Sequence, residues 1–118
     1  MIIDQSYAEH AFGECVGVAI AILSDSNPIL TNISISNVGA NGCYGGVLDI
    51  MQSSAIIENV TISQVFADKA MFLIESNNIS IKNLNIQNSD LFSIIDAVFI
   101  DSLSLNNIQI TNNSIYYS

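Results

Sequence analysis

The stretch "ISIKNLNIQN", residues 79–88, alternates apolar and polar residues, but one extra residue interrupts the alternation at its centre. Ile81 comes before this residue, Asn83, and Leu84 follows it directly. Period-2 alternation is typical of a strand with one buried face, and a single inserted residue turns every later side chain to the other face. The apolar side chains stay on one side only if the chain turns a corner at Asn83. Asparagine tolerates the left-handed conformation of such a corner better than most non-glycine residues, so we predict a strand, a one-residue corner and a second strand.

This pattern occurs four times along the chain, each time with asparagine at the interruption. The four segments are "PILTNISISN" (28–37), "AIIENVTISQ" (55–64), "ISIKNLNIQN" (79–88) and "LSLNNIQITN" (103–112). The aligned asparagines are Asn32, Asn59, Asn83 and Asn107. A unit of about 24 residues that repeats in this way predicts a solenoid, because one coil cannot bury its own interior and only stacking closes the core.

Apolar stretches between these segments are expected to form a third side of each coil. They are "GGVLDIM" (45–51), "AMFLIES" (70–76) and "FSIIDAVFI" (92–100), with "GVAIAILS" (17–24) in an earlier coil. We therefore predict an all-β parallel β-helix of about four to five coils over residues 17–118, continuing beyond the chain. Residues 1–16 are expected to be an irregular N-terminal stretch or cap. The corner asparagines are expected to form a structural ladder, with amide hydrogen bonds from coil to coil.

The alternative fold is a leucine-rich repeat. The stretch "LNNIQITNN" (105–113) fits the pattern L-x-x-L-x-L-x-x-N, and about 24 residues is an allowed period for that repeat. However, the final asparagine of the pattern occurs only at Asn113, where the other coils have Val38, Val65 and Ser89. Asparagine recurs at the mid-segment corner instead, which favours the parallel β-helix.

The strand–asparagine–strand corner of the "IKNL" type, over roughly residues 28–112, resembles the pectin-lyase-like family of right-handed parallel β-helices. In that family the corner carries an internal asparagine ladder, which the resemblance implies here. The stretch "GCYGGVLDI" (42–50) is similar to the G-G-A-[ILV] element of polymorphic outer-membrane and related surface proteins. Val47 replaces the alanine of that element, and only one coil has the double glycine. This second resemblance favours a large, repetitive surface protein over an enzyme.

The charge of the chain excludes two classes of partner. The chain has eleven acidic residues but only two lysines, Lys69 and Lys82, and no arginine. Its net charge is therefore −9 over 118 residues. Nucleic acids and anionic membranes both require clustered basic side chains, so we expect neither as a partner. No apolar stretch reaches the roughly 20 residues of a membrane helix, so we expect no membrane insertion of this segment. We expect no cofactor, although surface acids permit weak calcium binding.

The residues that the resembling enzymes need for catalysis are missing from the sequence. Pectate and pectin lyases use a basic residue, usually arginine, beside calcium-binding aspartates, and neither lysine lies in a matching motif. Glycoside hydrolysis needs paired carboxylates, and the candidates on neighbouring coils are Asp49 with Glu75 and Asp96 with Asp101. We interpret these as scattered solvent-facing acids. His10, the single histidine, lies in the N-terminal stretch. We therefore expect a protein that is not an enzyme.

Four Asn-x-Ser/Thr sequons are candidate N-glycosylation sites. They lie at Asn32, Asn59, Asn78 and Asn112. Glycosylation and a codon bias toward asparagine and serine explain their number about equally well. A ladder side chain that turns into the core cannot carry a glycan, so Asn78 and Asn112 are better candidates than Asn32 and Asn59.

The two cysteines, Cys15 and Cys43, lie about one coil apart. Adjacent rungs are close enough for a disulfide, which would indicate an oxidising compartment. Two free thiols in a core column are the equally supported alternative.

These observations predict a structural or adhesive segment of an extracellular or cell-surface protein, glycosylated and capable of forming filaments. Its expected partners are adjacent β-helix coils or copies of itself, and glycans. The alternative is a carbohydrate-binding or catalytically inactive lyase-like β-helix. The outward residues of the second strands form a polar row suited to carbohydrate contact, whereas Tyr44, Tyr116, Tyr117, Phe66 and Phe92 do not share one column. Because sugar binding favours aromatic platforms, the structural interpretation is preferred.

Overall fold

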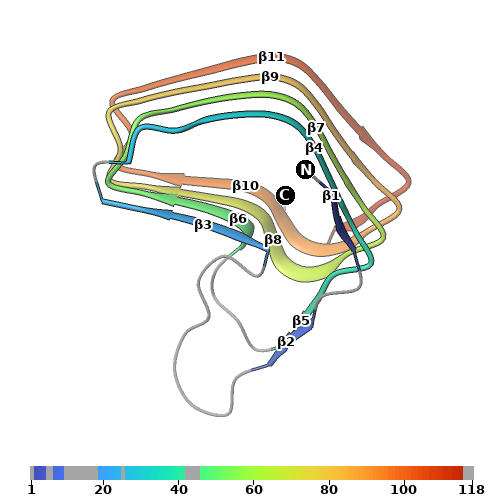
Figure 1. The fold of residues 1–118 in the computed structure, drawn as a ribbon. Helices are drawn as coiled ribbons and strands as arrows, with labels where there is room; N and C mark the ends of the chain where they lie inside the picture. Colours follow the sequence, from blue (N-terminus) through green and yellow to red (C-terminus); the bar gives the residue numbers. More distant parts are fainter. Residues whose placement is uncertain (1, 5–6, 10–18, 25, 42–45, 116–118) are drawn as a thin grey trace.

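The computed structural model describes residues 2–4, 7–9, 19–24, 26–41 and 46–115, which form an all-β solenoid of stacked parallel strands (Figure 1). The strands are β1 Ile2–Asp4, β2 Tyr7–Glu9, β3 Ile20–Leu23, β4 Ile29–Ser36, β5 Gly39–Asn41, β6 Gly46–Met51, β7 Ala55–Ser63, β8 Phe66–Ile74, β9 Asn78–Gln87, β10 Asp90–Val98, β11 Ser102–Thr111 and β12 Ser114–Ile115. The coils number about four and repeat with a period of about 24 residues. The predicted fold class is therefore confirmed. A leucine-rich repeat adds helical segments to its strands, and none occurs among the described residues.

Two parallel sheets line the solenoid. One has the order β1-β4-β7-β9-β11, and the other has the order β12-β10-β8-β5-β2, with β3 joined to β8 through β6. The register places equivalent residues above one another, as in the run from Leu30 through Ile57 and Ile81 to Leu105. The columns that the sequence alignment predicts are therefore the columns of the structure.

One coil is longer than the others because of extra residues between β5 and β6. Gly39 pairs with Phe66 and Gly46 pairs with Lys69, so the single strand β8 continues across a position where the preceding coil is interrupted. Figure 1 shows β5 and β6 apart from each other, with β8 bending past both. The first repeat is therefore longer than the two that follow it.

Each coil turns through three one-residue corners in the left-handed conformation. The first column contains the predicted corner residues, with φ of 55° at Asn32 and 57° at Asn59, Asn83 and Asn107, which confirms the interpretation of the interrupted alternation. The second column is Asn37, Gln64, Asn88 and Asn112, and the third is Ser24, Gln52, Glu75 and Phe99. Corner residues of the second and third columns still form backbone hydrogen bonds to the neighbouring coil. For example, the Gln52 N–H donates to the Ile74 carbonyl at 3.0 Å.

Isoleucine columns fill the core along the coil axis. Ile35, Ile62 and Ile86 are each 0% exposed, and every one of them contributes roughly 1.5–3 kcal/mol from burial. The next member of the column, Ile110, is 45% exposed because it lies in the last described coil. The core is therefore closed wherever coils stack on both sides.

Candidate functional site

The corner asparagines form a ladder of side-chain hydrogen bonds. Asn59 Nδ2 donates to Asn32 Oδ1 at 3.1 Å, Asn83 Nδ2 to Asn59 Oδ1 at 2.9 Å, and Asn107 Nδ2 to Asn83 Oδ1 at 2.8 Å. Asn59 and Asn83 thus each donate to the preceding coil and accept from the next one. All three side-chain hydrogen bonds therefore run from one coil to the coil before it.

The ladder lies on the outer surface of the solenoid. Asn32, Asn59 and Asn107 are exposed and Asn83 is half-buried. The expectation that these side chains turn into the core is wrong, and the physical reason is the corner itself. The apolar residues on both sides face the interior, so the corner residue lies on the convex side of the bend and its side chain points outward.

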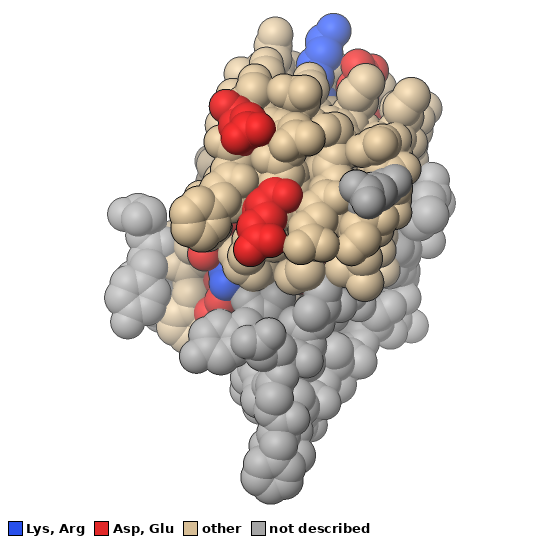
Figure 2. Space-filling model, turned by 90° about the vertical axis from the view of Figure 1, so that its left-hand side faces the viewer, with Lys and Arg blue, Asp and Glu red and all other residues tan. Residues whose placement is uncertain are grey.

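The third corner carries a second polar ladder, which sequence reasoning missed. Ser24 Oγ donates to Gln52 Oε1 at 3.0 Å, and Gln52 Nε2 donates to Glu75 Oε2 at 3.1 Å. Phe99 occupies the next position, with φ of 57° and 80% exposure. Figure 2 shows this corner face, where the Asp and Glu side chains of the described residues lie as separate groups among uncharged side chains.

Mostly buried serines satisfy the backbone polar groups next to the core. Ser53 N donates to Ser76 Oγ at 3.2 Å, and Val65 N donates to Ser89 Oγ at 3.2 Å, while the three serines are only 2–4% exposed. In the last coil Asn113 takes this place, and its Oδ1 accepts from Ser89 N at 2.9 Å. These side chains hold the backbone just after the second and third corners.

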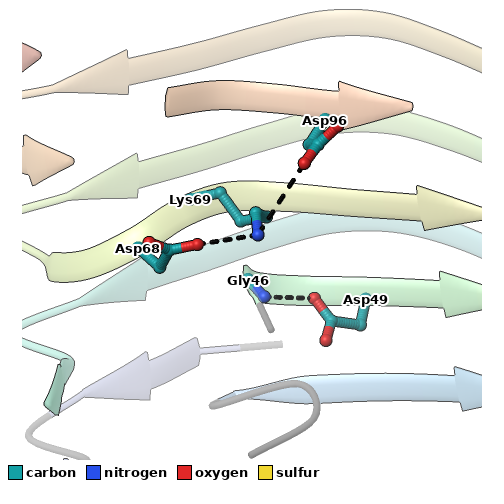
Figure 3. Close-up of polar contacts among 5 residues, drawn as sticks. All are labelled: Gly46, Asp49, Asp68, Lys69 and Asp96. Atoms are coloured by element: carbon teal, nitrogen blue, oxygen red, sulfur yellow. Dashed lines mark hydrogen bonds and ion pairs between the residues drawn. The ribbon is translucent and has the colours of Figure 1, made fainter. Parts of the chain in front are cut away.

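A lysine and three aspartates lie along the bend of β8 and the strands on either side of it (Figure 3). Lys69 Nζ lies 2.7 Å from Asp68 Oδ2 and 3.8 Å from Asp96 Oδ2, and 4.5 Å from the ring centroid of Phe72. The Lys69 side chain is only 8% exposed, so its charge is balanced by carboxylates on its own coil and on the next. On the preceding coil Asp49 is fully buried, and its Oδ1 accepts from Gly46 N at 2.5 Å. This cluster joins coils, and no sequence pattern indicated it.

The register does not place the suggested carboxylate pairs opposite each other. Asp49 lies opposite Phe72, whereas Glu75 accepts from Gln52 at the third corner. Asp96 also lies opposite Phe72, and Asp101 follows on the same coil. Among the described residues, no three His, Cys, Asp or Glu side chains gather closely enough to hold a metal ion. Weak calcium binding stays a prediction.

The predicted polar row lies on the first sheet, and its described members are half-buried or exposed. Its members pair in register along two columns, which are Ser34, Thr61, Asn85 and Gln109, and Ser36, Ser63, Gln87 and Thr111. Asn85 Oδ1 is buried without a hydrogen-bond partner in the described structure. Phe66 lies opposite Asp90, so Phe92, two residues further along, lies in a different column of the sheet.

The sequon asparagines lie in different surroundings. Asn32 and Asn59 belong to the ladder, and Asn112 is an exposed corner residue with φ of 53°. Asn78 is exposed at the start of β9, where its backbone N–H donates to Ser54 Oγ at 3.2 Å. Asn78 also borders a surface groove of about 400 Å³, lined by residues including Ile29, Ser54, Ile56, Ile79 and Ser80.

The remaining candidate residues fall outside the described part of the chain. Cys15 and Cys43, His10, and the tyrosines at 44, 116 and 117 are among them, so the disulfide and the free thiols stay alternatives. The predicted boundary after residue 16, between an irregular N-terminal stretch and the β-helix, also stays a prediction. Two strands lie before this boundary: β1 pairs with β4, and β2 pairs with β5.

Two findings bear on the class of this protein. The described residues include no helix long and apolar enough to cross a membrane. Comparison of the chain with protein-family models, with curated proteins and with solved structures finds no match.

Proposed function

We propose that this chain is a stiff structural segment of an extracellular or cell-surface protein, a non-enzymatic relative of the pectin-lyase-like β-helices. The observation that carries the proposal is the set of ladders along the coil axis. Two run on the outside, through amides at the first corner and through Ser24, Gln52 and Glu75 at the third. Together with the buried isoleucine columns, these ladders connect neighbouring coils at more than one point around their perimeter.

The last described coil supports stacking of this segment on further β-helix. Leu105 and Ile110 face the coil interior but are 49% and 45% exposed, whereas Ile81 and Ile86 in the same columns are 1% and 0% exposed. A further coil with apolar residues at these positions would bury them and pair with the edge of β11. Adjacent coils of a longer chain and copies of this chain both have that chemistry.

Amine labelling of intact cells that produce the protein tests its location. Lys82 is exposed, whereas the Lys69 side chain is only 8% exposed and ion-paired, so a membrane-impermeant reagent should modify the first and spare the second. Lys69 therefore serves as an internal control for folding. Modification of Lys82 only after cell lysis would contradict the proposal.

A carbohydrate-binding function is the second candidate, and a polar hollow at the third corner favours it. This hollow has a volume of about 390 Å³, and it is lined by Asn27, Gln52, Ser53, Ser54, Glu75 and Asn77. Amide and carboxylate groups of this kind bind sugar hydroxyls in pairs. Titration of the protein with neutral oligosaccharides, followed by the side-chain amide signals in NMR spectra, tests this function.

A further inference from the structure

The groove beside Asn78 combines an apolar wall with a hydroxyl-bearing wall. Ile29 is 69% exposed and Ile56 is 43% exposed, and they lie opposite each other in neighbouring coils. The next two members of this outward column are Ser80 and Ser104, which also line the groove. Exposed isoleucines next to serines form a surface that fits a ligand with one apolar face and one hydroxyl-rich edge.

Asn78 is the sequon residue whose side chain borders this groove and takes no part in a ladder. Among the described residues, its side-chain amide makes no hydrogen bond, whereas its backbone N–H donates to Ser54 Oγ. By contrast, the Asn59 amide donates to one neighbour and accepts from another, so a sugar on it would have to fit between amides one rung above and one rung below. All three residues of the sequon, Asn78, Ile79 and Ser80, line the groove.

We propose that Asn78 carries an N-linked N-acetylhexosamine and that its first sugar ring packs in this groove, against Ile56. The inference deepens the proposed function, because it names the position that bears the glycan and the surface on which the glycan rests. A cellular glycosyltransferase supplies the sugar from a glycosyl pyrophosphate donor. The Asn78 Nδ2 bonds to the anomeric carbon, the pyrophosphate leaves, and Nδ2 loses one proton and keeps the other.

The dimensions of the sheet fit this arrangement. Asn78 and Ile56 both point outward, one rung apart and two residues out of register, since Ser80 lies opposite Ile56. A rung spacing of about 4.8 Å and a rise of about 3.3 Å per residue put their Cα atoms about 8 Å apart. The asparagine side chain and one sugar ring span that distance. The ring face and the acetamido methyl group would cover the isoleucines, while the hydroxyls would reach Ser80 and Ser104.

Glycopeptide mass spectrometry of the protein from its native source, followed by thermal unfolding, tests the inference. We expect a glycan on Asn78, and we expect protein trimmed to one sugar per site to melt about 3 °C above the unglycosylated N78D variant. An Ile56→Ser variant, which repeats the serine of the next two coils, should lose that difference and still fold. An unmodified Asn78, or a difference in melting temperature that persists in the Ile56→Ser variant, would overturn the inference.

The outcome is separable from that of the proposed function. Surface labelling of Lys82 together with an unmodified Asn78 would overturn this inference and leave the structural segment proposed above. An Asn112→Gln variant is the matched control, because it removes an exposed sequon that does not line the groove. Removal of the Asn112 sequon should leave unchanged the difference in melting temperature between protein glycosylated at Asn78 and the N78D variant.

Discussion

Substitutions of Asn59 separate the two roles of a corner asparagine. Asn59→Gly keeps a residue that adopts φ of 57° without steric cost but removes both ladder bonds, at 3.1 and 2.9 Å. Because these bonds are exposed, each should contribute about 0.5 kcal/mol, so the variant should be less stable by about 1 kcal/mol. Asn59→Ala also loses both bonds and must hold a β-carbon in the left-handed conformation, which costs about 1–2 kcal/mol more. We therefore expect a total loss of about 2–3 kcal/mol for the alanine variant.

Urea denaturation followed by circular dichroism gives the free energies of unfolding for these variants. Asn107→Gly is the matched control: within the described structure Asn107 makes one ladder bond, at 2.8 Å, and has the same φ as Asn59. Its loss should be about half that of Asn59→Gly. An alanine variant no less stable than the glycine variant would refute the left-handed corner as the reason for asparagine. Equal losses at Asn59 and Asn107 would refute the contribution of the ladder.

Three further predictions concern substitutions at single positions. Ile86→Ala should lower the free energy of unfolding by about 3 kcal/mol, because this side chain is 0% exposed. Ile110→Ala should lower it by about half of that, because Ile110 is 45% exposed in the last described coil. Equal losses of stability in urea would contradict the end position of Ile110. Phe99→Asn should stabilise the protein by about 1 kcal/mol, since Phe99 is 80% exposed at φ of 57°, and calorimetry should record a higher melting temperature rather than a lower one. Gly46→Ala should destabilise it by about 1–3 kcal/mol, because a β-carbon there would lie 2.9 Å from Asp49 Oδ1 and 3.1 Å from the backbone of the next coil; unchanged urea sensitivity would contradict that packing.

The first corner was predictable from sequence because its signal is local. An asparagine that interrupts period-2 alternation both permits the left-handed conformation and marks where the chain turns, and the positive φ at Asn83 confirms it. The second corner also had a signal, because Asn37, Gln64, Asn88 and Asn112 end the four aligned segments. These residues align at the ends of the four segments, but the period-2 alternation is not interrupted at them, so the alternation did not indicate a corner.

The third corner was not predictable from residue type. Glu75 and Phe99 hold positive φ although neither residue type favours it, since the coil must close at that position in every rung. The exposure of the first ladder was missed for a related reason. Which side of a bend a side chain takes depends on the path of the whole coil and not on the residues next to it.

The candidate site was predictable only as a set of sequons. Four sequons look alike in the sequence, but the structure places two in a ladder, one at an exposed corner and one beside a groove. The groove needs Ile29 and Ile56 beside Asn78, and these residues come from three coils. The ion pair between Lys69 and Asp96 likewise depends on register, which no single segment specifies.

Electron microscopy of the protein from its native source is the most direct test of the proposal that this segment is part of a stiff rod. The four-coil unit measures 32 × 30 × 27 Å. If the β-helix continues in a longer chain or stacks on copies of itself, the particles should be elongated along the coil axis. Each added coil should lengthen them by about 4.8 Å. Compact particles that do not exceed about 32 Å in any direction would contradict the proposal.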